Sequence, residues 1–195
     1  MGEMKSAWER AQEKVEKLGK LTEEESRQLE CIPVGNKLAA RYLQDTNYNL
    51  DGELTKYKGT GLRKYVAQGA QEILLHNIIL PQNEHDKEMI KRAIAGLRIV
   101  KENRNQLATV LDRITNLINY YEQAHQQTYT QFKKGFEARL KEAGQALQKQ
   151  AGNPAAIEAQ LQSQFQSEWL AVSSQLNAQY EKALEEHKQH IQKIA

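Results

Sequence analysis

The 195-residue sequence contains one cysteine, three prolines and no long apolar run. The lone Cys31 excludes an internal disulfide and fits a reducing compartment, where we expect it to be a small buried apolar residue. No apolar stretch approaches the roughly 20 residues that span a bilayer. The N-terminus leads into a polar amphipathic segment rather than the apolar core of a signal peptide. These features predict a cytoplasmic protein with no membrane partner.

Neither sign of charge dominates the sequence. The net charge is +2, and basic and acidic residues alternate along the chain, so the electrostatic footprint of a dedicated DNA-binding protein is weak. Valine and isoleucine nowhere alternate with polar residues, so no sheet is expected. The many Ala, Gln, Glu, Lys and Leu residues are typical of exposed helices. The composition therefore predicts an all-α fold.

The strongest turn signal is Ala-Gly-Asn-Pro at residues 151–154. It places glycine just past one helix end, asparagine at the cap of the next helix and proline at its first position. Apolar residues recur at helical spacing from about Leu107 to this turn and from the turn to Ile194. Two such helices joined by a tight turn should form a long, antiparallel, coiled-coil-like hairpin.

The apolar seam of this hairpin predicts how its two helices pair. If the chain folds back about Asn153, Phe136 faces Trp169. The same register pairs Leu140 with Phe165, Phe132 with Val172, and Tyr129 with Leu176. We expect the best packing where the aromatic residues cluster. The candidate interaction surface consists of Phe132, Phe136, Phe165, Trp169 and Leu176.

The part of the chain before the hairpin predicts shorter helices that form a small bundle. Glycine and proline signals predict breaks at Pro33, at Gly35 and at residues 59–61. The expected helices cover residues 4–18, 22–31, 38–44, 54–58, 62–80 and a stretch from about 84 to 100 that Asn83 caps.

Residues 102–105 allow two interpretations. A heptad can be drawn through them with Arg104 on the seam, or the helix can stop and restart with Asn105 as the new cap. Two asparagines and a charged seam position favour the break. Residues 1–103 then form an N-terminal helical domain, and residues 104–195 form the hairpin with its turn at 151–154.

No catalytic, metal or cofactor site emerges from the motifs. His187 and His190 have a spacing that can bind metal on a helix, but His187 falls on the seam and no cysteine accompanies the pair. Gly59 and Gly61 precede basic residues at a helix start, where an anion could bind. They lack the strand and the Gly-Lys-Ser/Thr ending of a phosphate loop. We therefore expect no cofactor and no small-molecule ligand.

A basic and aromatic stretch suggests RNA as an alternative partner. Tyrosines, including Tyr42 and Tyr65, alternate with cations here, as single-stranded RNA sites require for base stacking and phosphate contact. Tyr42 and Tyr65, however, fall at core positions of their helices. The candidate anion- or RNA-binding cations are Arg41, Lys56, Lys58, Arg63 and Lys64.

Two short stretches and the Gln-rich tail carry a resemblance to a known family. Met-Lys-Ser-Ala-Trp-Glu at residues 4–9 and Glu-Lys-Leu-Gly-Lys-Leu-Thr at residues 16–22 resemble a helical bacterial protein family with no assigned activity. The resemblance implies a bacterial, cytoplasmic origin. It implies no catalytic or binding residues.

The leading hypothesis is a non-enzymatic structural or protein-interaction module. Two long helices alone bury little surface per residue, and a second hairpin would complete a four-helix core, so we expect self-association as a homodimer. An unidentified protein partner fits the same surface. The first alternative is an RNA- or ribosome-binding protein. The second is an enzyme, which would need a polar pocket in the bundle.

Overall fold

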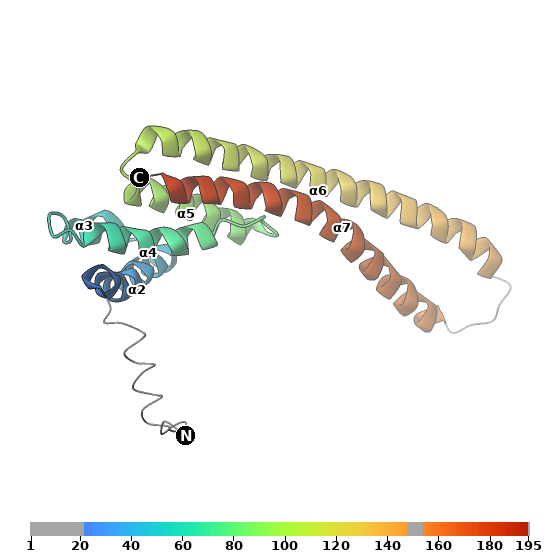
Figure 1. Cartoon of the computed structure of the whole chain (residues 1–195). Helices are drawn as coiled ribbons and strands as arrows, with labels where there is room; N and C mark the ends of the chain where they lie inside the picture. Colours follow the sequence, from blue (N-terminus) through green and yellow to red (C-terminus); the bar gives the residue numbers. More distant parts are fainter. Residues whose placement is uncertain (1–21, 148–153, 195) are drawn as a thin grey trace, which may run out of the picture. The chain divides into compact units, whose positions relative to one another are not determined.

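The computed structural model describes residues 22–147 and 154–194, and within them the side chains of 22–141 and 158–194. These residues contain no strand, which confirms the all-α fold. The predicted helix at 4–18 and most of the predicted turn lie outside the described residues. Figure 1 shows the helices α2 (Glu23–Gln44), α3 (Leu50–Thr55), α4 (Arg63–His76), α5 (Glu84–Val100), α6 (Arg104–Leu147) and α7 (Pro154–Lys193).

The chain divides into two compact units, residues 1–73 and 74–195. The boundary between the two units falls within α4. The helix α5 thus belongs to the same unit as the hairpin, because it packs against α6. The division into separate domains at residue 103 stays a prediction.

In the first unit, α2 is one continuous helix, so the predicted break at Pro33 and Gly35 is wrong. Its start follows the prediction, because Thr22 and Glu25 form a capping box. The Glu25 amide donates to the Thr22 hydroxyl at 3.2 Å, and the Thr22 amide donates to the Glu25 carboxylate at 2.8 Å. The capping residues therefore predicted where this helix begins, whereas the helix-breaking residues did not predict where it ends.

Glycine in α2 serves helix packing instead of helix termination. A Cβ placed on Gly35 would lie 1.9 Å from the carbonyl oxygen of Val66 in α4. Likewise, a Cβ on Gly69 would lie 2.1 Å from the carbonyl oxygen of Ile32. The two helix backbones approach so closely that only a residue without a side chain fits at either position.

The next two helices depart from their predicted bounds. α3 begins at Leu50, earlier than expected, because the Asn49 side chain accepts the Gly52 amide at 2.9 Å and caps it. α4 ends at His76 rather than at residue 80. The break at residues 59–61 is confirmed, since both glycines there have positive φ angles of 82° and 70°.

In the second unit, the break at residues 102–105 is confirmed. α5 ends at Val100 and α6 begins at Arg104. The cap differs from the prediction, because Asn103, not Asn105, accepts the Gln106 amide, at 3.3 Å. Nearby, the Lys101 ammonium donates to the carbonyl oxygen of Ile194, which ties the α5–α6 connection to the end of α7.

The two long helices run antiparallel, as predicted, but in a different register. Tyr121 contacts Tyr180 with ring centres 5.4 Å apart, and Phe136 contacts Phe165 at 5.1 Å. The predicted pairing of Phe136 with Trp169 is therefore wrong by about one helical turn. α6 ends at Leu147 and α7 begins at Pro154, so the midpoint of the turn lies about two residues before the pivot expected at Asn153. This difference shifts every pairing partner along α7.

Burial in the hairpin is deepest where α5 adds a third helix. Leu107, Leu111, Ile114, Tyr121 and Ile191 are at most 1% exposed. In contrast, Phe132, Phe165 and Trp169 are only half-buried. The expectation that the aromatic cluster would be the best-packed region is wrong, because two helices cannot enclose large rings on all sides.

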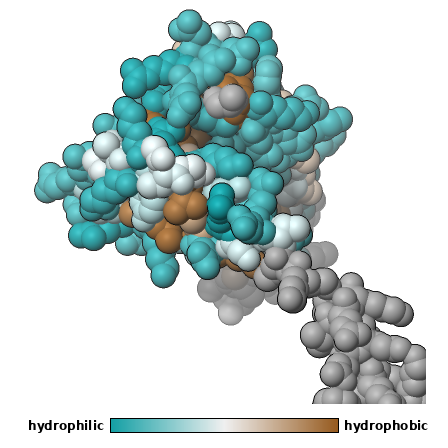
Figure 2. Space-filling view, turned by 60° about the vertical axis from the view of Figure 1, so that its left-hand side comes forward, coloured by the Kyte–Doolittle hydropathy of each residue, from teal (hydrophilic) through white to brown (hydrophobic). Residues whose placement is uncertain are grey.

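The molecular face in Figure 2 is largely hydrophilic and carries small apolar patches. This agrees with the 27% of charged residues in the sequence. Among the described helices, none is both long and apolar enough to cross a membrane.

Candidate functional site

The candidate site is the hairpin arm, which we define as residues 129–141 of α6 and 158–176 of α7. Four of the five residues predicted as an interaction surface meet here. Ring centres lie 5.0 Å apart for Phe132 and Phe165, 5.5 Å for Phe132 and Trp169, and 5.1 Å for Phe136 and Phe165. Leu176, the fifth, is half-buried about two turns further along α7. The sequence thus located the aromatic cluster, although not its pairing.

Edge-to-face and tilted contacts hold the arm together. Tyr129 meets Trp169 at 5.0 Å with an interplanar angle of 77°, and Phe136 meets Phe165 at 85°. Such pairs contribute about 0.5–1.5 kcal/mol each beyond the area they bury. Phe136 is 5% exposed, whereas its partners remain open on one flank. The contacts between aromatic rings hold the two helices of the arm together, and part of the apolar surface of these rings stays exposed.

A long stretch of α7 that overlaps the arm has almost no charge. Residues 159–180 include a single charged side chain, Glu168. Its carboxylate pairs with the Arg139 guanidinium at 2.6 Å and also accepts the Gln164 amide at 2.8 Å. The Arg139 contact, followed by the Gln164 contact, lowers the pKa of Glu168. The one charge of this stretch is therefore matched within the same hairpin.

Two apolar side chains protrude from this stretch of α7. Leu170 is 65% exposed and Val172 is 37% exposed. Leu170 directly follows the seam residue Trp169, which is half-buried, whereas Leu170 is exposed and so lies off the seam. Sequence reasoning missed it because only seam residues were considered. An apolar residue off the seam, in a segment with a single charged residue, was the available signal.

A polar network marks the place where the arm joins the rest of its unit. The Tyr121 hydroxyl donates to the Asn177 side-chain oxygen at 2.9 Å and accepts from the Gln82 side-chain amide at 3.1 Å. These bonds connect α6, α7 and the α4–α5 connection. Tyr121 is 1% exposed, and burial raises the pKa of its phenol. The sequence offered no signal for this network, since its three members lie far apart in the chain.

A polar groove of about 580 Å³ lies beside this network. At its edge, the Lys87 ammonium contacts Glu122 at 2.6 Å and Glu84 at 2.8 Å. Both carboxylates raise the pKa of Lys87, the Glu122 contact more strongly. Because Lys87 is already matched by two acids, the groove offers an anion little attraction. Its lining consists of residues 81–84, 87, 121–123 and 125–127.

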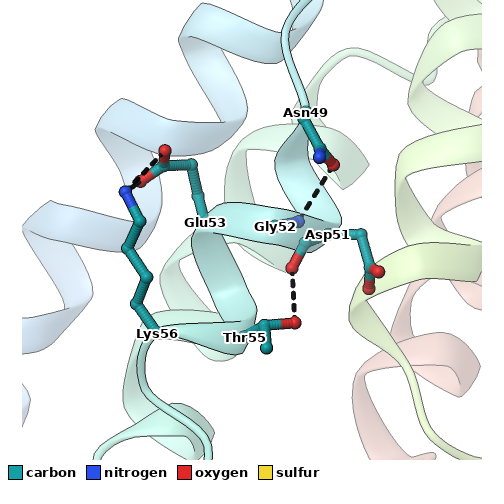
Figure 3. A network of polar contacts seen from close by, with 6 residues as sticks. All are labelled: Asn49, Asp51, Gly52, Glu53, Thr55 and Lys56. Carbon is teal, nitrogen blue, oxygen red and sulfur yellow. Dashed lines mark hydrogen bonds and ion pairs between the residues drawn. The ribbon is translucent and has the colours of Figure 1, made fainter.

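The basic residues predicted for RNA lie in the first unit, and several have internal partners. Lys56 pairs with Glu53 at 2.7 Å (Figure 3). Lys64 pairs with Glu24 at 3.2 Å. Tyr65 is 4% exposed, so its ring offers no face on which a base could stack.

The remaining predicted cations are Arg41, Lys58 and Arg63. The Arg41 guanidinium lies 4.8 Å from the ring centre of Tyr48. Lys58 is exposed, and Arg63 opens α4. RNA binding through these side chains stays a prediction.

The histidines do not gather into a metal centre within the described part of the chain. No group there of three or more His, Cys, Asp or Glu side chains could hold a metal ion. His187 is half-buried and His190 is exposed on the last turns of α7. His125 instead packs between Tyr121 at 5.6 Å and Trp169 at 5.3 Å. The position of His125 therefore suits a packing role.

Comparison with known proteins identified one relationship. A family model described as a family of unknown function (DUF6657) matches residues 51–193. The expectation of a family with no assigned activity is confirmed. The stretches at residues 4–9 and 16–22 that carried the resemblance lie outside the matched region. No curated protein and no solved structure matched the chain.

Proposed function

The chain belongs to the DUF6657 family of unknown function, and we propose that it is a non-enzymatic interaction module that forms a homodimer through its hairpin arm. The observation that carries this proposal is the stretch at residues 159–180, in which Glu168 is the single charged residue and from which Leu170 protrudes with 65% of its surface exposed. Charge depletion around exposed apolar side chains is characteristic of the core of a protein interface.

The absence of charge favours a second copy of the same chain as the partner. In a two-fold dimer the same patch occurs on both subunits, so like charges in that patch would face one another. The stretch at 159–180 avoids this repulsion because Arg139 already neutralises Glu168. The corresponding side of α6 carries exposed Lys133 and Lys134, which makes it a poorer self-complementary surface.

Covering the exposed leucines supplies a useful part of the binding energy. Complete burial of one leucine side chain contributes about 1.5–3 kcal/mol. Two copies of Leu170, each 65% exposed, would therefore contribute roughly 2–4 kcal/mol when covered. The half-buried Phe165 and Trp169 lie in the same arm, and covering their open flank would add to this energy.

The test compares two leucines with nearly equal exposure. Leu170→Glu places a charge in the proposed interface, whereas Leu29→Glu places the same charge on α2, where Leu29 is 63% exposed. We expect sedimentation velocity over a concentration series to show a monomer–dimer equilibrium for the wild type and for Leu29→Glu. Leu170→Glu should raise the dissociation constant by roughly 30-fold or more.

Equal dimerisation of the wild type and Leu170→Glu would contradict the proposal. So would an equal loss in both variants, because that result would indicate a general effect of added charge. Unchanged far-ultraviolet circular dichroism in both variants serves as the folding control.

A further inference from the structure

Leu170 lies on a side of α7 away from the seam with α6, which we call the free side. Glu168 is on the opposite side of the helix, where its carboxylate contacts the Arg139 guanidinium of α6 at 2.6 Å. Helical periodicity groups further exposed residues with Leu170 at steps of three and four or their sum. The exposed residues of the free side are Ala159, Ser163, Gln166, Leu170, Ser174 and Glu181.

Charge is distributed unequally along the free side. Leu170 stands midway between Ala159 and Glu181 in the sequence, about three helical turns from each. Towards the C-terminal end of α7, Glu181 is the first charged residue of this side. From Leu170 back to Ala159 the same side has no charge. The two ends of the free side therefore differ, and the direction in which two copies pair decides what Glu181 meets.

The free side is covered where α7 approaches its C-terminal end. Lys188 lies about five helical turns beyond Leu170 on the same side of the helix, and it is half-buried. One turn to either side of Lys188, Leu184 is 3% exposed and Ile191 is 0% exposed. The chain's own residues therefore cover α7 from about Leu184 onward. A second molecule can reach only the part of the free side that precedes Leu184.

A two-fold axis that runs along α7 would pair two free sides in parallel. Each residue then faces its own copy. Glu181 would face Glu181 of the partner subunit, and like charges that face one another across an interface repel. The covered ends of both α7 helices would also lie side by side and would hold the open stretches apart.

A two-fold axis across α7 at Leu170 pairs the same sides antiparallel and avoids both problems. Leu170 still meets its own copy, so like patches remain in contact as the proposed dimer requires. Glu181 faces Ala159 of the partner subunit, because both residues are equally far from the axis. Lys188 and the residues after it lie beyond Pro154, where the partner's α7 begins. The two covered ends therefore stay apart.

We propose that two copies of the chain pair through the free sides of their α7 helices in antiparallel orientation, with the two-fold axis at Leu170. This inference rests on the proposed self-association and specifies how the two arms meet. The apolar contact then lies at the centre of the interface with small and polar side chains around it, which is the usual arrangement of an interface core and its rim.

Opposite charges at Ala159 distinguish the two orientations. In the antiparallel dimer, Ala159→Lys places an ammonium opposite Glu181 of the partner subunit, and each dimer gains this contact twice. At low salt we expect Ala159→Lys to lower the dissociation constant about two- to tenfold and Ala159→Glu to raise it by a similar factor. In a parallel dimer residue 159 faces its own copy, so both substitutions would weaken association. Sedimentation velocity of the full chain measures both variants.

Crosslinking of single cysteines tests the same geometry directly. In a Cys31→Ala background, the antiparallel dimer places Ala159→Cys about 33 Å along α7 from its own copy, and Glu181→Cys equally far from its own. A short bismaleimide cannot bridge that distance. We therefore expect a crosslinked dimer when the two variants are mixed and none when either is treated alone. Ser167→Cys lies close to the axis and should crosslink to its own copy in either orientation.

Crosslinking of either variant alone would overturn the antiparallel arrangement and leave self-association through the arm intact. A crosslink in Ser167→Cys with none in the mixture would have the same meaning, as would weaker association of both charge variants. Absence of every crosslink would overturn the proposed function together with this inference, because Ser167 lies within any dimer that forms through the free side.

Discussion

Adding one methyl group at different glycines tests the packing of α2 on α4. Gly35→Ala places a Cβ 1.9 Å from the Val66 carbonyl oxygen, a backbone atom that cannot rotate away. The two helices must therefore separate. Gly135→Ala adds the same methyl group to α6, where nothing beyond the neighbouring residues and backbone of the same helix lies within 4 Å of the new Cβ. The two substitutions share their chemistry and differ only in the space available.

The structure predicts that the two substitutions change the free energy of unfolding in opposite directions. Overpacking a tight contact costs about 1–3 kcal/mol, so Gly35→Ala should lower the free energy of unfolding by about that amount. Replacing glycine by alanine within an exposed helix contributes about 0.8–1.0 kcal/mol, so Gly135→Ala should stabilise the hairpin.

Urea denaturation followed by circular dichroism measures both changes. If Gly35→Ala stabilises the protein as Gly135→Ala does, the close approach of α2 and α4 is wrong. The original expectation of a chain break at Gly35 would then regain support, because a break has room for the methyl group.

Two further predictions concern single polar contacts. Tyr121→Phe removes the hydroxyl that joins Gln82 and Asn177, and urea denaturation should show a loss of about 0.5–1.5 kcal/mol. Tyr120→Phe, at a side chain that is 64% exposed, is the control and should change nothing; equal effects would refute a structural role for the network. Glu24→Gln tests a carboxylate whose pKa is lowered by the Tyr65 hydroxyl and then by Lys64. Because the folded pKa is the lower one, Glu24 stabilises the fold at neutral pH and loses this effect as pH falls through the carboxylate range. The variant should therefore have a lower urea midpoint than the wild type at neutral pH and the same midpoint in acid, and a difference that persists in acid would refute the assignment.

Helix ends with strong capping chemistry could be predicted from the sequence. Asn83 caps α5 by accepting the Asp86 amide at 3.0 Å, and Pro154 opens α7. Such signals act between neighbours in the chain and need no knowledge of the fold. The continuity of α2 could not be predicted in the same way. Gly35 is needed because the backbone of Val66 in another helix packs against it. Rules that consider only neighbours in the sequence therefore predicted that this glycine breaks the helix.

The hairpin register shows a second limit of sequence reasoning. Two seams with the same spacing match equally well after a shift of one turn, so Phe136 could face either Phe165 or Trp169. Only the position of the helix ends decides between them. The same limit affects the candidate site. Spacing located the aromatic cluster, whereas the network of Gln82, Tyr121 and Asn177 joins residues far apart in the chain and required the placement of the helices.

The mass of the full chain in solution tests the central proposal most directly. Sedimentation equilibrium over a wide concentration range should give the monomer mass of 22.4 kDa at high dilution. The mass should rise towards twice that value as concentration increases. A mass that stays at 22.4 kDa throughout would contradict self-association through the arm.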